Sequence, residues 1–152
     1  MPESSVLPSH GSYLLPHVDH ATVGDAMHPG ILSCDKDATL IEVARMMSTH
    51  HVHCIVVRST THAQENASPS WGIISDIDVL RARVRPDAPD TAADLAHGPV
   101  TTVQTTDPLR DAAELMLSQG TRHVVAVNPE TGRAVGILST LDIAGVLAWG
   151  EL

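Results

Sequence analysis

The sequence repeats itself once, and this internal repeat is the strongest constraint on the fold. A shift of 69 positions places residues 22–57 on residues 91–126, and a shift of 64 then places 72–78 on 136–142. The change of offset corresponds to a loop that is five residues longer in the first copy. Because a repeat of this length is one supersecondary unit that packs against its neighbour, we expect two pseudo-symmetric copies that share a core.

Each copy predicts the same order of elements, β-α-β-β-α, and therefore an α/β fold of the α+β type. Apolar residues at helical spacing mark an amphipathic helix in each copy, with stripes at Leu40, Val43, Ala44 and Met47 and at Leu109, Ala112, Ala113 and Met116. Short apolar and β-branched runs predict the strands, at residues 31–34, 53–57, 71–75, 100–103, 123–127 and 134–139. A second helix is expected to begin near Ser75 in one copy and near Ser139 in the other.

The repeat also divides the chain into segments. We expect a flexible tail over residues 1–20, a first repeat over 22–84, a connector over 85–90 and a second repeat over 91–150. The connector is polar and holds two prolines, which suits a link on the surface. We therefore expect one integrated module of two repeats.

Composition narrows the classes of function. The net charge is −9 and the nine Lys and Arg are scattered, which argues against nucleic-acid binding because that needs clustered cations. No apolar run reaches the ~18 residues of a membrane span, and no secretory signal is visible. The two cysteines, Cys34 and Cys54, are too few for a disulfide framework. We therefore expect a cytoplasmic protein.

Both copies carry a Gly-apolar-apolar-Ser-x-x-Asp motif where a strand passes into a helix. The motif places Ser75 with Asp78 in the first copy and Ser139 with Asp142 in the second. One interpretation is structural, because Ser and Asp at this spacing form a capping box. The other is a ligand site, because a helix N-terminus attracts anions and a carboxylate with a neighbouring hydroxyl can bind the hydroxyls of a ribose. The residues alone leave both interpretations open.

The chain resembles a tandem pair of CBS domains, named for cystathionine β-synthase and also called a Bateman module. The resemblance is carried by VGDAMHPGILSCDKDATLIEVARMMSTHHVHCIVV with GIISDIDVLRA, and by AADLAHGPVTTVQTTDPLRDAAELMLSQGTRHVVAV with GILSTLDIAGVL. Together these stretches cover residues 22–150, about 85% of the chain. The resemblance implies a regulatory module, not an enzyme, that binds AMP, ADP, ATP or S-adenosylmethionine in the cleft between the repeats.

The resemblance also implies which residues surround such a ligand. Asp78 and Asp142 would hold the ribose hydroxyls, with Ser75 and Ser139 beside the ribose and phosphate. The other candidates are main-chain and flanking positions of the strands, namely Ile31, Leu32, Ser33, His53, Cys54, Val100, Thr101, Thr102, Arg122 and His123. No cofactor is implied beyond this regulatory ligand. The implied partners are a second copy of the chain, as a homodimer, and an effector protein that the sequence does not name.

Departures from the family pattern bear on the ligand. Many nucleotide-binding members carry Arg directly before the Asp, whereas Ile77 and Leu141 stand there in this chain. This removes two phosphate partners and disfavours a triphosphate. Arg122 supplies a cation to the second site, so we expect unequal sites with a monophosphate at the second. His28 and His97 replace a small hydroxyl residue, and we expect packing or ligand-lining roles for them.

Other functions are weighed against this one. A ligand-free dimerisation module would use apolar helix residues outside the core stripes, namely Ile41, Met46, Leu115, Leu117, Val146, Leu147 and Trp149. A histidine-based metal site would draw on His51, His53 and His62, although surface or cleft-lining roles are the simpler expectation. An enzyme is disfavoured, because the sequence has no GxSxG elbow, P-loop or HExxH motif, and Cys34 and Cys54 are expected to be buried.

Overall fold

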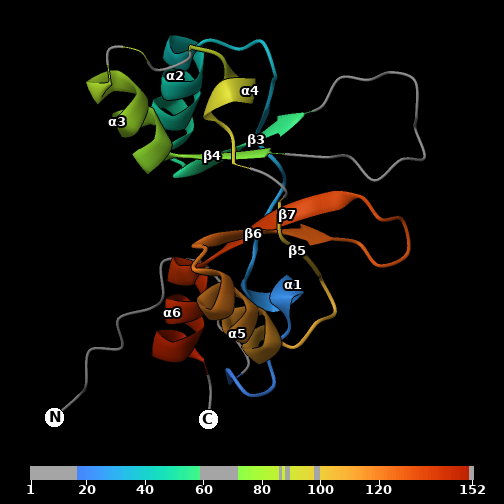
Figure 1. Cartoon of the computed structure of the whole chain (residues 1–152). Coiled ribbons are helices and arrows are strands. Elements are labelled where there is room, and N and C mark those ends of the chain that lie inside the picture. Colours follow the sequence, from blue (N-terminus) through green and yellow to red (C-terminus); the bar gives the residue numbers. More distant parts are fainter. Residues whose placement is uncertain (1–16, 59–71, 86, 88–89, 98–99, 151–152) are drawn as a thin grey trace, which may run out of the picture. The chain divides into compact units, whose positions relative to one another are not determined.

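The structure, a computed structural model, describes residues 17–58, 72–85, 87, 90–97 and 100–150 (Figure 1). Most of the expected tail, the loop at 59–71 and part of the expected connector lie outside these residues. The described elements are α1 (Val23–Ala26), β1 (His28–Pro29), β2 (Ser33–Asp35), α2 (Leu40–His50), β3 (Cys54–Arg58), β4 (Gly72–Ser75), α3 (Asp76–Val84), α4 (Ala92–Leu95), β5 (Thr102–Gln104), α5 (Leu109–Gln119), β6 (His123–Val127), β7 (Ala134–Ser139) and α6 (Thr140–Trp149). This order confirms the predicted α/β fold with two copies of one unit.

These helices and strands form two compact units that divide the chain differently from the sequence repeats. The central unit comprises Gly30–Thr101, and the terminal unit combines Met1–Pro29 with Thr102–Leu152. The short helix that opens each repeat therefore belongs with the strands of the other repeat: α1 lies in the terminal unit and α4 in the central unit.

The central unit is built on a three-stranded sheet in the order β2-β3-β4. Strand β3 is parallel to β2 and antiparallel to β4. Helices α2, α3 and α4 lie on one face of this sheet (Figure 1). The buried core between helices and sheet is aliphatic with one thiol, and consists of Cys34, Val43, Met47, Ile55, Val57, Ile74, Ala82, Ala92 and Leu95.

The terminal unit has a four-stranded sheet in the order β1-β7-β6-β5. Strand β6 is parallel to β5 and antiparallel to β7, and β1 is antiparallel to β7. Helices α1, α5 and α6 lie on one face of the sheet (Figure 1). The core consists of Ala21, Val23, Val103, Leu109, Ala112, Met116, Val124, Ala126, Leu138 and Val146.

The predicted helical stripes of α2 and α5 are confirmed. Val43 and Met47 of α2 are buried, as are Leu109, Ala112 and Met116 of α5. Each buried Val, Leu or Met side chain contributes about 1.5–3 kcal/mol through removal of apolar surface from water. The packing of these stripes therefore accounts for the position of both helices.

Local backbone signals begin and end these helices. The Thr39 hydroxyl accepts the Glu42 N–H at 3.2 Å and the Glu42 carboxylate accepts the Thr39 N–H at 2.9 Å, which forms a capping box at the start of α2. Gly120 ends α5 with a φ of 63°, a conformation that glycine adopts without strain. His51 occupies the matching position after α2, with a φ of 52°.

Three strands begin later in the chain than the sequence predicts. β2 begins at Ser33, β3 at Cys54 and β5 at Thr102, because these residues are the first to pair with a neighbouring strand. The strand candidates that precede these strands are Ile31, Leu32, His53, Val100 and Thr101. A strand that the sequence analysis missed is β1, whose two residues pair with Ile137 and Gly136 of β7.

Candidate functional site

The first candidate site lies where β4 passes into α3, in the central unit. The Asp78 Oδ2 atom accepts the Ser75 N–H at 2.8 Å and the Ser75 hydroxyl at 2.9 Å, and the Asp78 N–H points back to the Ser75 Oγ at 3.4 Å. This is the capping box that the spacing predicts. The Asp78 side chain is only 5% exposed, and its charge must be met by hydrogen bonds because it is removed from water.

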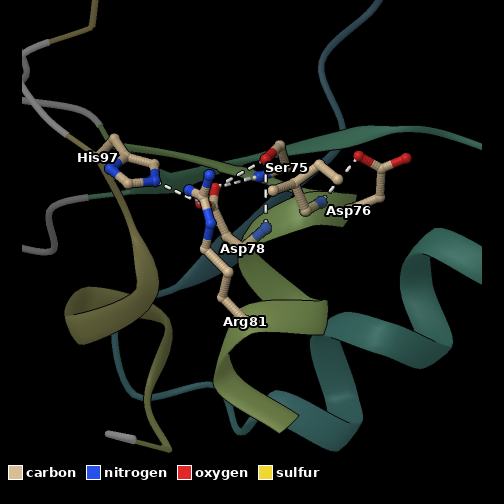
Figure 2. A network of polar contacts seen from close by, with 6 residues as sticks. Ser75, Asp76, Asp78, Arg81 and His97 are labelled. Carbon is tan, nitrogen blue, oxygen red and sulfur yellow. Dashed lines mark hydrogen bonds and ion pairs between the residues drawn. The ribbon is translucent and has the colours of Figure 1, made fainter. Parts of the chain in front are cut away.

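The second carboxylate oxygen of Asp78 is turned to charged and titratable side chains. The Asp78 Oδ1 atom contacts the Nε2 atom of His97, and the Arg81 guanidinium lies 3.8 Å from the same oxygen. Figure 2 shows His97, Arg81 and Ser75 converging on this carboxylate from three directions. The site therefore combines one buried anion, one hydroxyl, one imidazole and one guanidinium.

His97 is held at this place by its backbone. His97 and Ile73 of β4 exchange two backbone hydrogen bonds of 3.0 and 3.1 Å, which add the segment after α4 to the edge of β4. Gly72 permits this approach, because a Cβ atom there would lie 2.5 Å from the Cβ of Ala96. The chain's own backbone after α4 therefore makes the close approach to this glycine.

The terminal unit builds the same arrangement where β7 passes into α6. The Asp142 Oδ2 atom accepts the Ser139 N–H at 2.8 Å and the Ser139 hydroxyl at 2.9 Å. The Asp142 Oδ1 atom contacts the Nδ1 atom of His28 at 2.7 Å, and the Asp142 side chain is 6% exposed. His28 is placed by the pairing of β1 with β7, opposite Ile137. Gly136 permits this pairing, since a Cβ there would lie 2.6 Å from the His28 carbonyl oxygen.

The two sites differ at the position three residues after the carboxylate. Arg81 stands three positions after Asp78, whereas Gly145 stands three positions after Asp142. A Cβ atom at Gly145 would meet nothing within 4 Å. The central site therefore carries a guanidinium next to its carboxylate where the terminal site has open space.

The strand candidates of the central unit lie on β2 and β3 or directly before them, in the same sheet as β4, which passes into α3. Cys54 pairs with Ser75 across β3 and β4, and Ser33 pairs with Val56 on the other side of β3. The His53 carbonyl accepts the Asp76 N–H at 3.0 Å, and the His53 Nδ1 atom lies 3.1 Å from the Asp76 carboxylate. The thiol of Cys54 is buried, so this residue borders the site through its backbone.

The strand candidates of the terminal unit take equivalent positions around α6. His123 pairs with Ser139 across β6 and β7, and the Arg122 carbonyl accepts the Thr140 N–H at 3.1 Å. Thr102 pairs with Val125 on the other side of β6. The candidates Val100 and Thr101 instead fall at the end of the central unit. The structure thus places Arg122, His123 and Thr102 in the unit that holds Asp142.

The Asp78 and Asp142 side chains are buried, unlike the acidic residues of the other capping boxes in the described residues. The boxes Thr22–Asp25 and Thr39–Glu42 have the same hydrogen-bond pattern, but their acidic residues are exposed. Capping alone does not need a desolvated carboxylate. The burial of Asp78 and Asp142 therefore indicates a further role.

The remaining titratable groups give no competing site among the described residues. Within these ranges no group of three or more His, Cys, Asp and Glu is placed to hold a metal ion, and His62 lies outside them. Cys34 and Cys54 are buried, as predicted. Burial, with a smaller effect from the charge of Asp35, raises the pKa of the Cys34 thiol. In the same ranges no helix has the length and apolar character to cross a membrane.

Three partners of the carboxylates were not predicted from the sequence. Arg81 follows Asp78 by three residues, and this spacing on a helix is a signal that could have found it. The contacts of His28 and His97 depend on strand pairing between the start of one repeat and the end of the other. Nothing in the local sequence around either histidine carries that information.

The chain matches the CBS domain family over residues 23–85 and 92–148. It belongs to this family, and the two matched segments confirm the two repeats. A solved CBS domain protein of Pyrobaculum aerophilum, complexed with AMP, is 32% identical, with a TM-score of 0.67, over 84% of this chain and 98% of that one.

A further solved structure and a further sequence relative are similar to this chain. A CBS domain pair solved with 5′-methylthioadenosine and S-adenosyl-L-methionine gives a TM-score of 0.72 at 20% identity, covering 84% of this chain and 96% of that one. An uncharacterized protein of Methanopyrus kandleri is 27% identical over 128 residues, which are 82% of this chain and 62% of that protein. The chain thus spans less than two thirds of this relative.

Proposed function

We propose that the chain is a regulatory module that binds an adenosine-type ligand, with the ribose at Asp78 in one unit and at Asp142 in the other. The observation that carries the proposal is the matched pair of buried carboxylates at strand-to-helix junctions. Each keeps one oxygen in its capping box and turns the other to a partner outside the helix.

The donor and acceptor inventory of each site suits a ribose. The two vicinal hydroxyls of a ribose are hydrogen-bond donors, and an ionised carboxylate is an acceptor with two oxygens. Hydrogen bonds to a charged, buried acceptor are stronger than those between neutral groups. The N–H groups at the start of α3 or α6 favour an anionic group nearby, and Arg81 adds a cation at the Asp78 site.

The ligands of related proteins support the adenosine class. The 32% identical relative is complexed with AMP, and a structural neighbour is complexed with 5′-methylthioadenosine and S-adenosylmethionine. These three compounds share an adenosine with a ribose diol and differ at the 5′ position. We propose the shared adenosine as the recognised group in this chain, with a monophosphate favoured over a triphosphate.

Calorimetric titration of the native chain with AMP, ATP, S-adenosylmethionine and 5′-methylthioadenosine tests this proposal. We expect saturable heat from at least one of them and none from adenine, which lacks the ribose. In the Asp78→Ala and Asp142→Ala variants the affinity of the altered site should fall about tenfold or more, because a hydrogen bond to a charged group contributes about 1.5–3 kcal/mol.

The matched control is Glu42→Ala, which removes the acidic residue of an exposed capping box. It should cost about 1 kcal/mol of stability and leave binding unchanged. If no ligand of the panel binds the folded native chain, the alternative holds. The Ser-x-x-Asp motifs then serve as helix caps in a ligand-free dimerisation module.

We propose that ligand binding to this chain regulates another protein. A ligand shifts a protein between two arrangements only through a difference in its affinity for them, and we propose that this shift is passed to an effector chain in the cytoplasm. No catalytic step is assigned to the chain itself. Its two cysteines, Cys34 and Cys54, are buried thiols, which suits a reducing compartment.

We further propose a homodimer formed through apolar helix surfaces. Ile41, Leu117, Leu147 and Trp149 are exposed on α2, α5 and α6, and exposed apolar surface of this kind marks contact sites. The other expected interface residues lie deeper. Val146 is buried in the core of the terminal unit, and Met46 and Leu115 are half-buried against the two cores.

A further inference from the structure

Each carboxylate of the candidate sites has a limited capacity to accept hydrogen bonds. An ionised carboxylate offers about four acceptor positions on its two oxygens. The Ser75 N–H and Ser75 hydroxyl occupy both positions of the Asp78 Oδ2 atom, and the His97 Nε2 atom takes one on Oδ1. One position remains, whereas a ribose diol that donates both of its hydroxyls needs two.

The same count holds in the terminal unit. The Ser139 N–H and hydroxyl occupy the Asp142 Oδ2 atom, and the Nδ1 atom of His28 lies 2.7 Å from Oδ1. The histidines use different ring nitrogens and come from different local structures, a two-residue strand for His28 and an isolated bridge for His97. The chain therefore places an imidazole on the same acceptor atom twice.

We propose that His28 and His97 are affinity-determining residues that compete with the ribose diol for the Oδ1 atoms of Asp142 and Asp78. The diol is bound through both hydroxyls only when the imidazole leaves this oxygen. The histidines thereby lower the affinity for ligands with a 2′,3′-diol and reduce discrimination against ligands without one. This inference rests on the proposed adenosine site and names the residues that set its selectivity.

The exposure of the two rings makes this exchange physically simple. Each histidine side chain is 69% exposed, while its carboxylate partner is 5–6% exposed. An imidazole can therefore turn into water by side-chain rotation, without loss of core packing. The backbone hydrogen bonds that position His97 are made by its N–H and carbonyl with Ile73, so they do not depend on the ring.

The test compares two nucleotides that differ only in the diol. AMP and 2′,3′-dideoxyadenosine 5′-monophosphate are titrated calorimetrically into the native chain and into the His28→Ala, His97→Ala and doubly substituted variants. We expect AMP to bind about tenfold more tightly at each freed carboxylate, the effect of one additional charge-assisted hydrogen bond. The affinity for the dideoxy nucleotide should stay within about twofold of the native value.

A conservative variant separates the ring from its donor group. His97→Gln retains an N–H donor that can reach the carboxylate, so it should bind AMP like the native chain and not like His97→Ala. Circular dichroism and thermal unfolding check that each variant is folded. We expect folded variants, because both histidine side chains are exposed and their backbone pairing is retained.

The outcomes distinguish the inference from the function on which it rests. Tighter AMP binding confined to the alanine variants supports the competition. Unchanged AMP affinity overturns it and means that the histidines have no part in binding. A parallel loss of affinity for both nucleotides also overturns it and means that the histidines contact the ligand directly. If neither the native chain nor any folded variant binds AMP, the adenosine site itself is wrong.

Discussion

A carboxylate that only caps a helix gains nothing from burial. Glu42 performs this role in water, whereas Asp78 and Asp142 are desolvated, which costs free energy unless the charge is met by donors. The chain meets it with a serine and a histidine at each site. Acidic residues at the same spacing from a hydroxyl residue thus differ in environment.

The Cys34 thiol gives a prediction at the same scale. Burial raises its pKa, so the reactive thiolate fraction at a given pH is smaller than in an exposed cysteine. In a Cys54→Ala variant, which leaves Cys34 as the only thiol, labelling by a disulfide reagent at pH 8 should be about tenfold or more slower in the native state than in urea. Equal rates in the two states would show that Cys34 is accessible.

At the scale of elements, the helices were predictable and the partners of the sites were not. The stripe that includes Leu109 and Met116 is local, and so is the Ser75-x-x-Asp78 box, because helix packing and capping act over one or two turns. Contact between His28 and Asp142 requires β1 to pair with β7. A two-residue strand has no periodicity that a sequence could display.

Substitution of Gly72 in β4 and of Gly145 in α6 by alanine should change the stability of the fold in opposite directions. In Gly72→Ala the new Cβ would lie 2.5 Å from the Cβ of Ala96, and overpacking of this kind costs about 1–3 kcal/mol. Gly145→Ala is the matched control, because its Cβ meets nothing within 4 Å and alanine in a helix interior is favoured by about 0.5–1 kcal/mol. Urea unfolding should show a loss of stability for the first variant and a gain for the second. A stable Gly72→Ala variant would contradict the close approach of the segment that carries His97.

At the scale of the whole molecule, the compact units cut across the sequence repeats. α1 and α4 each belong to the unit whose Asp they help to complete, since His28 follows α1 and His97 follows α4. Each candidate site therefore draws on both repeats of the sequence, although each lies within one unit. A fragment cut at the repeat boundary would lack the histidine of its own carboxylate.

The proposed homodimer is tested by mass in solution. Leu117 is exposed on α5, and a charge on a buried apolar interface is costly. We expect Leu117→Glu to shift sedimentation equilibrium toward the monomer, whereas Glu114→Gln, an exposed polar change on the same helix, leaves the dimer intact. If the native chain sediments as a monomer, the proposed homodimer is wrong.

The number of AMP molecules bound per chain tests the central claim most directly. Equilibrium dialysis with labelled AMP would be run on the native chain, Asp78→Ala, Asp142→Ala and the doubly substituted variant, each verified as folded. If both carboxylates hold a ribose, the account predicts two molecules per native chain, one in each single variant and none in the double variant. Equal binding by all four proteins would contradict it, because the ligand would then lie away from Asp78 and Asp142.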